Sequence, residues 1–261
     1  MAYQWKEQLN RLMKAGATYA DVRYYPKDDS LFMLMRNGNM LSFGQGRESG
    51  FGVRVLADGA WGFAASSNMA DITGTFDKAL SNARAAARRL TRPIRLADKE
   101  ALSGSFTSPA DLDTLTVQRD VQADFLQKMD RALQQTGVSQ RLSYISAQSK
   151  TMEYYDTEGA QIVKNIRELF PTILVRGKDV DGETQERKYS PPRLGKTRGY
   201  EIMREEHWLP EAERIVRELN QTLVAPKCPH DVRSVILMPD QMFLQVHETI
   251  GHPLELDRIL G

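Results

Sequence analysis

The sequence SGFGVRVLADGAWGFAAS, residues 49–66, carries the clearest folding signal in the chain. Phe51, Val53 and Val55 alternate with smaller or polar residues, which is the pattern of a strand with one buried face. Asp58–Gly59 follows, and both of these residues tolerate a positive φ in a two-residue turn. The stretch therefore predicts a β-hairpin.

Helices and further strands are predicted before and after this hairpin. The first helix has an apolar stripe formed by Trp5, Leu9, Leu12 and Met13, and Gly16 is its expected end. Two short strands are expected around residues 21–25 and 31–36, joined by turns to the hairpin. A second amphipathic helix is expected from about residue 71 to 90.

The rest of the chain shows the same mixture of helical and strand patterns. In order, it predicts a helix over 116–135, hairpins turning at 158–159 and 181–182, a helix over 209–223, a strand over 233–238 and a helix from about 240. Alternating hairpins and amphipathic helices favour an α+β fold, with mixed, mainly antiparallel sheets and covering helices.

Changes in composition suggest three units. The small, polar stretch 103–109 marks the first boundary, and Pro226 marks the second. The expected division is 1–102, 103–225 and 226–261, the last being only the opening of a third domain.

Composition also limits the function. Lys plus Arg is 35 and Asp plus Glu is 34, so no overall field favours nucleic acid or an anionic membrane. No apolar run approaches the roughly 20 residues of a membrane helix, and the first residues lack a secretory signal. With one cysteine, Cys228, the chain has no internal disulfide, and we expect a cytoplasmic protein.

Two histidines and a glutamate stand close together in QVHETIGHPLELDRILG, residues 245–261. Imidazole is a common zinc ligand, but His247 and His252 are five residues apart, which is about 140° around a regular helix. Both can face one ion only if the helix is irregular between Glu248 and His252. We expect Gly251, which tolerates unusual φ and ψ, and Pro253, which disfavours helical geometry at His252, to cause this through a wide turn or a helix that ends at Gly251.

Glu248 then has an evident role as the base that takes a proton from water. The alternative is that these are ordinary residues near a helix C-terminus, where histidine interacts favourably with the helix dipole. The residue pattern alone leaves both interpretations open.

The motif VHETIGHPLELD, residues 246–257, resembles the signature of the TldD/PmbA family, the "modulator of DNA gyrase" proteins, which are zinc-dependent peptidases. Residues 17–25, 49–66 and 150–165 also resemble segments of that family. The resemblance implies N-terminal and central domains of the TldD/PmbA type. It also implies zinc bound by His247 and His252, with Glu248 as the catalytic base.

The same resemblance implies a substrate and partners. The substrate would be a peptide or an unfolded protein segment, and the chain would form a homodimer or a heterodimer with a family paralogue. The family's third zinc ligand is a late cysteine, and Cys228 precedes the motif, so we expect a C-terminally truncated chain with an incomplete site. The alternative is a non-catalytic dimerisation or substrate-binding fragment, and DNA binding is the weakest interpretation.

Overall fold

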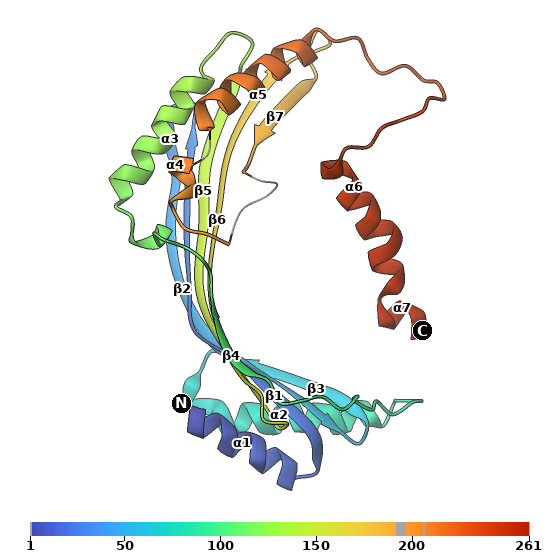
Figure 1. Ribbon diagram of the computed structural model, residues 1–261. Helices are drawn as coiled ribbons and strands as arrows, with labels where there is room; N and C mark the ends of the chain where they lie inside the picture. The colour runs from blue at the N-terminus through green and yellow to red at the C-terminus, as the bar shows by residue number, and fades with distance from the viewer. Residues whose placement is uncertain (1, 192–196, 206, 261) are drawn as a thin grey trace.

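One long, curved sheet runs through most of the protein in the computed structural model, which describes residues 2–191, 197–205 and 207–260 (Figure 1). The sheet has seven strands in the order β3-β2-β1-β5-β6-β4, and β7 also pairs with β6. The strands are β1 (Ala17–Arg36), β2 (Asn39–Ala57), β3 (Ala60–Ser66), β4 (Ser103–Thr107), β5 (Gln140–Asp156), β6 (Gln161–Lys178) and β7 (Thr184–Tyr189).

Most neighbouring strands are antiparallel. β1 lies between β2 and β5, and β5 pairs with β6 over nearly its whole length. β4 is the exception, because it pairs with β6 in parallel. The sheet is therefore mixed and mainly antiparallel, and the predicted α+β class is confirmed.

Strand β1 is continuous where the sequence predicted two strands. Its register shifts around Pro26, between Tyr25 and Asp28 against β2 and between Tyr24 and Lys27 against β5. Proline has no N–H to donate to a ladder and is found at such irregularities within sheets. The chain stays in the sheet across this irregularity, so the two predicted strands form a single element.

The first core lies at one end of the sheet, beneath α1 (Ala2–Lys14) and α2 (Ile72–Ala87). The ring of Trp5 is fully buried and packs 5.2 to 6.2 Å, centroid to centroid, from the rings of Tyr24, Phe51 and Phe76. A short 3-10 turn, η1 (Met69–Asp71), precedes α2. The predicted hairpin is confirmed here as β2 and β3, with positive φ at Asp58 and Gly59.

The second core lies at the other end, beneath α3 (Arg119–Leu133) and α5 (Trp208–Leu223), and both predicted helices are confirmed. A 3-10 turn, η2 (Thr114–Thr116), and the short α4 (Ile202–Glu205) also lie at this end. Strand β1 contributes residues to both cores, for example Val22 to the first and Met33 to the second. The strands before and after the predicted boundary at 102/103 thus belong to one sheet that has two cores. Both predicted domain boundaries stay predictions.

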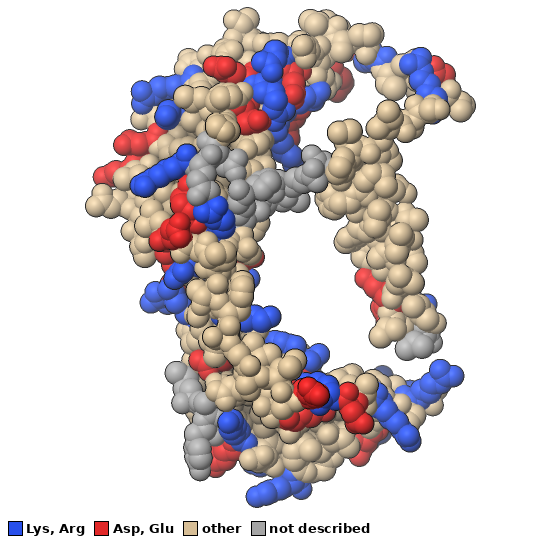
Figure 2. Space-filling model, viewed as in Figure 1, with Lys and Arg blue, Asp and Glu red and all other residues tan. Residues whose placement is uncertain are grey.

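The segment after α5 stands apart from the sheet (Figure 1). Its helical elements are α6 (Pro239–Val246), the π-helical turn η3 (His247–Gly251), the 3-10 turn η4 (His252–Leu254) and α7 (Leu256–Leu260). Figure 2 shows a wide opening between this segment and the rest of the molecule, and few charged side chains on its visible surface. Lys227 pairs with Asp181 at 2.7 Å where the segment leaves the body.

The strand predicted over 233–238 is wrong. Residues 233–238 have no regular structure, and Val235 and Ile236 are exposed. A strand needs a ladder partner for its N–H and C=O groups, and none of the described residues pairs with this stretch. In the parts of the chain that the structure describes, no helix is long and apolar enough to cross a membrane.

Candidate metal centre

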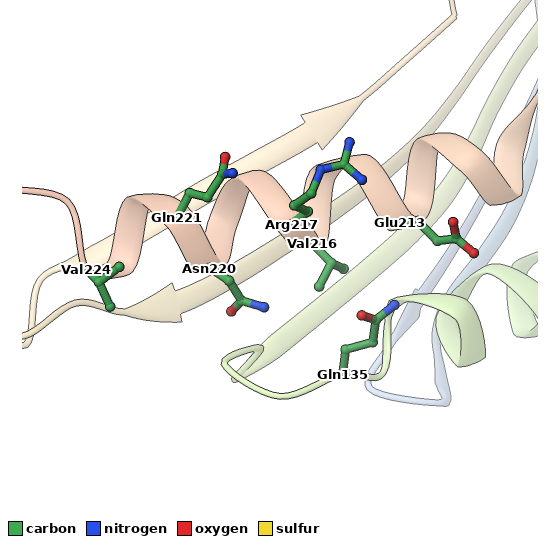
Figure 3. A pocket seen from close by; sticks show the side chains of 7 residues that line it. All are labelled: Gln135, Glu213, Val216, Arg217, Asn220, Gln221 and Val224. Atoms are coloured by element: carbon green, nitrogen blue, oxygen red, sulfur yellow. The ribbon is translucent and has the colours of Figure 1, made fainter.

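A polar depression lies between α5 and the end of α3, with a volume of about 570 Å³ (Figure 3). Its lining includes Gln135, Glu213, Arg217 and Asn220. These side chains offer neither an imidazole nor a pair of carboxylates, which are the groups expected of a metal site or an acid–base pair. The depression is therefore a surface feature of the second core and no candidate site.

The second group of titratable side chains lies on the sheet, where β1 and β5 meet. Asp156 accepts hydrogen bonds from the Lys99 ammonium at 2.6 Å, the Ala160 N–H at 2.8 Å and the Tyr154 hydroxyl at 3.1 Å. Burial alone raises the pKa of Asp156, but these donors more than offset burial, so the pKa is lowered. This cluster ties the segment around Lys99 to the sheet, which is a structural role.

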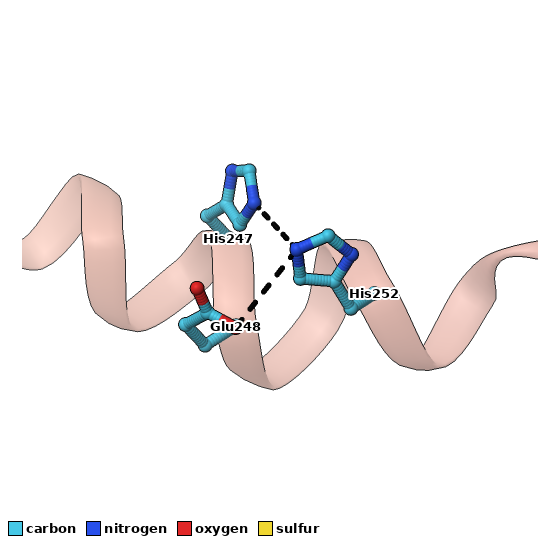
Figure 4. A group of neighbouring side chains, drawn as sticks. All are labelled: His247, Glu248 and His252. Atoms are coloured by element: carbon cyan, nitrogen blue, oxygen red, sulfur yellow. Dashed lines mark hydrogen bonds and ion pairs between the residues drawn. The ribbon is translucent and has the colours of Figure 1, made fainter.

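The three residues singled out by the sequence motif meet at one point (Figure 4). His247 Nε2 lies 2.7 Å from His252 Nε2, and His252 Nε2 lies 3.9 Å from Glu248 Oε2. One ligand atom from each residue can be chosen so that all three lie within 4.8 Å of one another. His252 is partly buried, and the other two side chains are exposed.

A π-helical turn brings the two histidines together. The helix of α6 widens at η3, and the His252 N–H donates to the carbonyl oxygen of His247, five residues earlier. In a regular helix this spacing would place the rings on different sides, whereas a π turn closes over five residues. The structure thus has the irregularity that the spacing requires.

The wide turn that the sequence suggested is present, but the non-helical backbone that it suggested at Gly251 and His252 is not observed. Gly251 has φ −60° and ψ −61°, and His252 has φ −64° and ψ −41°, so both stay in the helical region. Pro253 still contributes, because it has no N–H for the carbonyl of Thr249 and its ring crowds that carbonyl in a regular helix. Widening the preceding turn removes this conflict without either residue leaving the helical region.

A carboxylate that the sequence analysis did not single out for a role contacts the centre from behind. Glu255 Oε1 lies 2.8 Å from His252 Nδ1, the ring nitrogen that faces away from His247. The other oxygen of Glu255 accepts a hydrogen bond from Arg258 Nε at 2.9 Å. The spacing of three residues between His252 and Glu255 was the available signal, since such residues are neighbours on a helical surface.

The donor set fits a zinc ion. Two imidazole nitrogens, each about 2.0–2.1 Å from a tetrahedral ion, lie about 3.3 Å apart. The observed separation of 2.7 Å is shorter, so a small rotation of the rings suffices to admit the ion. Imidazole and carboxylate suit zinc, although catalytic zinc takes three protein ligands and water. Cys228 is exposed and does not belong to this cluster.

Comparison with known proteins supports the resemblance to a metallopeptidase family. The family model described as "PmbA/TldA metallopeptidase domain 1" matches residues 20–87. A metalloprotease of Methanocaldococcus jannaschii is 26% identical over 262 residues, covering 97% of this chain and 55% of that protein. A metalloprotease of Methanothermobacter thermautotrophicus is 26% identical over 253 residues, which cover 93% of this chain and 51% of that metalloprotease. The chain thus spans about half the length of these relatives.

A solved structure shows the same fold. A protein of Thermotoga maritima described as a proposed modulator of DNA gyrase superposes with a TM-score of 0.67 and 13% identity. The match covers 88% of this chain and 50% of that one. The solved structure shows the fold alone, whereas the domain match and the two metalloprotease relatives support assignment of the chain to the TldD/PmbA family.

Proposed function

We propose that this chain carries the zinc-binding histidines and the catalytic base of a peptidase that acts on peptides or unfolded protein segments. One observation carries the proposal, which is the π turn that brings His247, Glu248 and His252 to one point. Family membership and the names of the two metalloprotease relatives support it.

Each of the three residues has a distinct role. His247 and His252 would hold zinc through their Nε2 atoms, which face each other. Bound zinc polarises a carbonyl group and makes water more acidic, toward a pKa of about 7. Glu248 would take the proton of the attacking water and deliver it to the leaving amine, which is the work of a general base that then acts as an acid.

The surroundings of the cluster suit an extended substrate. An open, apolar hollow of about 650 Å³ adjoins His247 and is lined by Leu237, Met242, Phe243 and Val246 among others. An open hollow admits a side chain of a peptide, while a folded protein presents few extended segments. As part of the proposal, the protein acts in the cytoplasm and as a homodimer or a heterodimer with a paralogue.

A second candidate function is a non-catalytic dimerisation or substrate-binding module. The observation that favours it is the ligand count, because the cluster offers two imidazoles and Glu248 is needed as the base. A catalytic zinc with three protein ligands then requires one from outside the cluster.

Zinc content separates the two candidates. Elemental analysis of the purified chain should find close to one zinc per chain, lost in the His247→Ala, His252→Ala double variant. The matched control is His230→Ala, an exposed histidine outside the cluster, which should keep its zinc. Where a neighbouring chain supplies the third ligand, the zinc-loaded protein should also cleave an unfolded protein such as reduced casein. No zinc in the unaltered chain would refute the zinc site and leave the binding module as the better account.

A further inference from the structure

We propose that Glu255 is a positioning residue that sets the tautomer of His252 and so keeps its Nε2 atom available as a ligand. The inference rests on the proposed function only for the identity of the metal. Its basis is the hydrogen bond between Glu255 Oε1 and His252 Nδ1, which is 2.8 Å long.

The chemistry of the two groups decides where the ring proton lies. An ionised carboxylate accepts hydrogen bonds and donates none, whereas neutral imidazole has one donor and one acceptor nitrogen. The short contact with Glu255 therefore requires the proton on Nδ1 of His252. Nε2 then carries the lone pair, and it points toward His247 and Glu248.

The opposite tautomer would be unfavourable at this geometry. With the proton on Nε2, the Nδ1 lone pair would face a carboxylate oxygen at 2.8 Å with no hydrogen between them. His247 does not reverse this preference. Its Nε2 atom lies 2.7 Å from His252 Nε2 and can either donate or accept a hydrogen bond there, because neutral imidazole exists as the Nδ1–H and the Nε2–H tautomer.

Glu255 is itself held in place. Its Oε2 atom accepts from Arg258 Nε, and its carbonyl oxygen accepts from the backbone N–H groups of Arg258 and Ile259. Its own N–H donates to the carbonyl oxygen of His252. Both the backbone and the side chain of Glu255 are thus fixed relative to the ring that it orients.

The same arrangement is known from zinc sites in general, where a carboxylate behind a ligating histidine fixes its ring and raises its basicity. Loss of such a partner typically weakens metal binding by about 10- to 100-fold. We therefore expect Glu255 to strengthen zinc binding without touching the ion.

The tautomer can be measured without any metal. The complete 261-residue chain, labelled with ¹⁵N-histidine and treated with chelator, is studied by long-range ¹H–¹⁵N correlation NMR at about pH 8.5, well above the ordinary imidazole pKa. His252→Gln identifies the signals of His252. The unaltered chain should show His252 protonated at Nδ1. Glu255→Gln should shift it to a mixture with Nε2–H, because an amide can donate as well as accept.

The matched control is Asp257→Asn. Asp257 is a neighbouring carboxylate that accepts a hydrogen bond from the Arg258 backbone N–H at 3.0 Å and forms no hydrogen bond or ion pair with either of the two described histidine rings. This variant should leave the tautomer unchanged. Backbone amide shifts outside residues 250–258 should stay the same in both variants, which separates a change of tautomer from loss of the helical turns.

Zinc affinity gives an independent second result. In competition with a chromophoric chelator, Glu255→Gln should bind zinc about 10- to 100-fold more weakly, and Asp257→Asn should match the unaltered chain. The role of Glu255 would be overturned if His252 of the unaltered chain were protonated at Nε2. It would also be overturned if His252 had the same tautomer in Glu255→Gln as in the unaltered chain. If the unaltered chain binds no zinc, the proposed function fails. The NMR experiment then still tests whether Glu255 sets the tautomer of His252.

Discussion

Replacing Gly62 with alanine tests how closely β3 and α2 pack in the first core. Gly62 lies in β3, where an added Cβ would come 2.8 Å from Ala83 Cα and would also meet the Ala79 carbonyl oxygen and the Ala83 nitrogen. Carbon atoms in ordinary contact are about 3.5–4.0 Å apart. These obstacles are backbone atoms, so no side-chain rotation removes the clash and α2 has to move outward by about 1 Å.

The cost follows from what that movement disturbs. Phe76, Ala79 and Leu80 of α2 are buried against the sheet and α1. Overpacking a core costs about 1–3 kcal/mol, and more where the backbone must shift. We expect Gly62→Ala to lower the free energy of unfolding by about 3 kcal/mol. For a chain of this size that corresponds to a melting temperature lower by about 6–12 °C.

Urea unfolding followed by circular dichroism and tryptophan fluorescence measures this cost. The matched control is Gly104→Ala in the exposed strand β4, where an added Cβ meets nothing within 4 Å. The control should unfold within about 0.5 kcal/mol of the unaltered chain. If Gly62→Ala unfolds at the same urea concentration as the control, the close packing of β3 on α2 is refuted.

Three further predictions concern the proposed base, the sheet cluster and the C-terminal segment. Glu248→Gln should keep its zinc and lose about 10²- to 10⁴-fold in the rate of peptide hydrolysis; unchanged turnover would remove the base from the mechanism. Asp156 has a lowered pKa, so its charge stabilises the fold above about pH 3.8, and this is lost as the pH falls through the folded-state pKa. Asp156→Asn should therefore flatten the acid side of a plot of unfolding free energy against pH, and an unchanged slope would contradict the pairing with Lys99. Ile236→Ser should change that free energy by less than about 0.5 kcal/mol, because the side chain is 90% exposed; a larger loss in urea unfolding would show that this segment packs.

Local patterns predicted the elements that depend on local chemistry. The turn at Asp58–Gly59 was readable because its two positive φ values, 51° and 78°, suit aspartate and glycine. The first helix was readable from its apolar stripe, of which Trp5, Leu9 and Leu12 are buried and Met13 is partly exposed. In each case the residues that carry the signal are the residues that form the structure.

Pairing between distant strands was not predicted. β4 aligns Ser103 with Gln161 in parallel, and nothing in the residues 103–107 identifies β6 as the partner. The merging of two predicted strands into β1 also depends on ladders with β2 and β5, which bridge the irregularity at Pro26. The prediction of a strand over 233–238 was wrong for the converse reason. This stretch has a strand-like composition, but no ladder partner among the described residues.

In the candidate site, too, the sequence predicted some features and not others. The five-residue spacing from His247 to His252 is incompatible with one shared metal ion on a regular helix, and the structure has a π turn at this point. The unusual φ and ψ expected at Gly251 are absent because a helix can widen while its residues keep helical φ and ψ. The contact from Glu255 was not predicted, because a spacing of three residues from His252 indicates proximity on a helical surface and not which ring nitrogen is contacted. A histidine proposed as a metal ligand should therefore be examined with the carboxylates three and four residues beyond it, since its second ring nitrogen needs an acceptor.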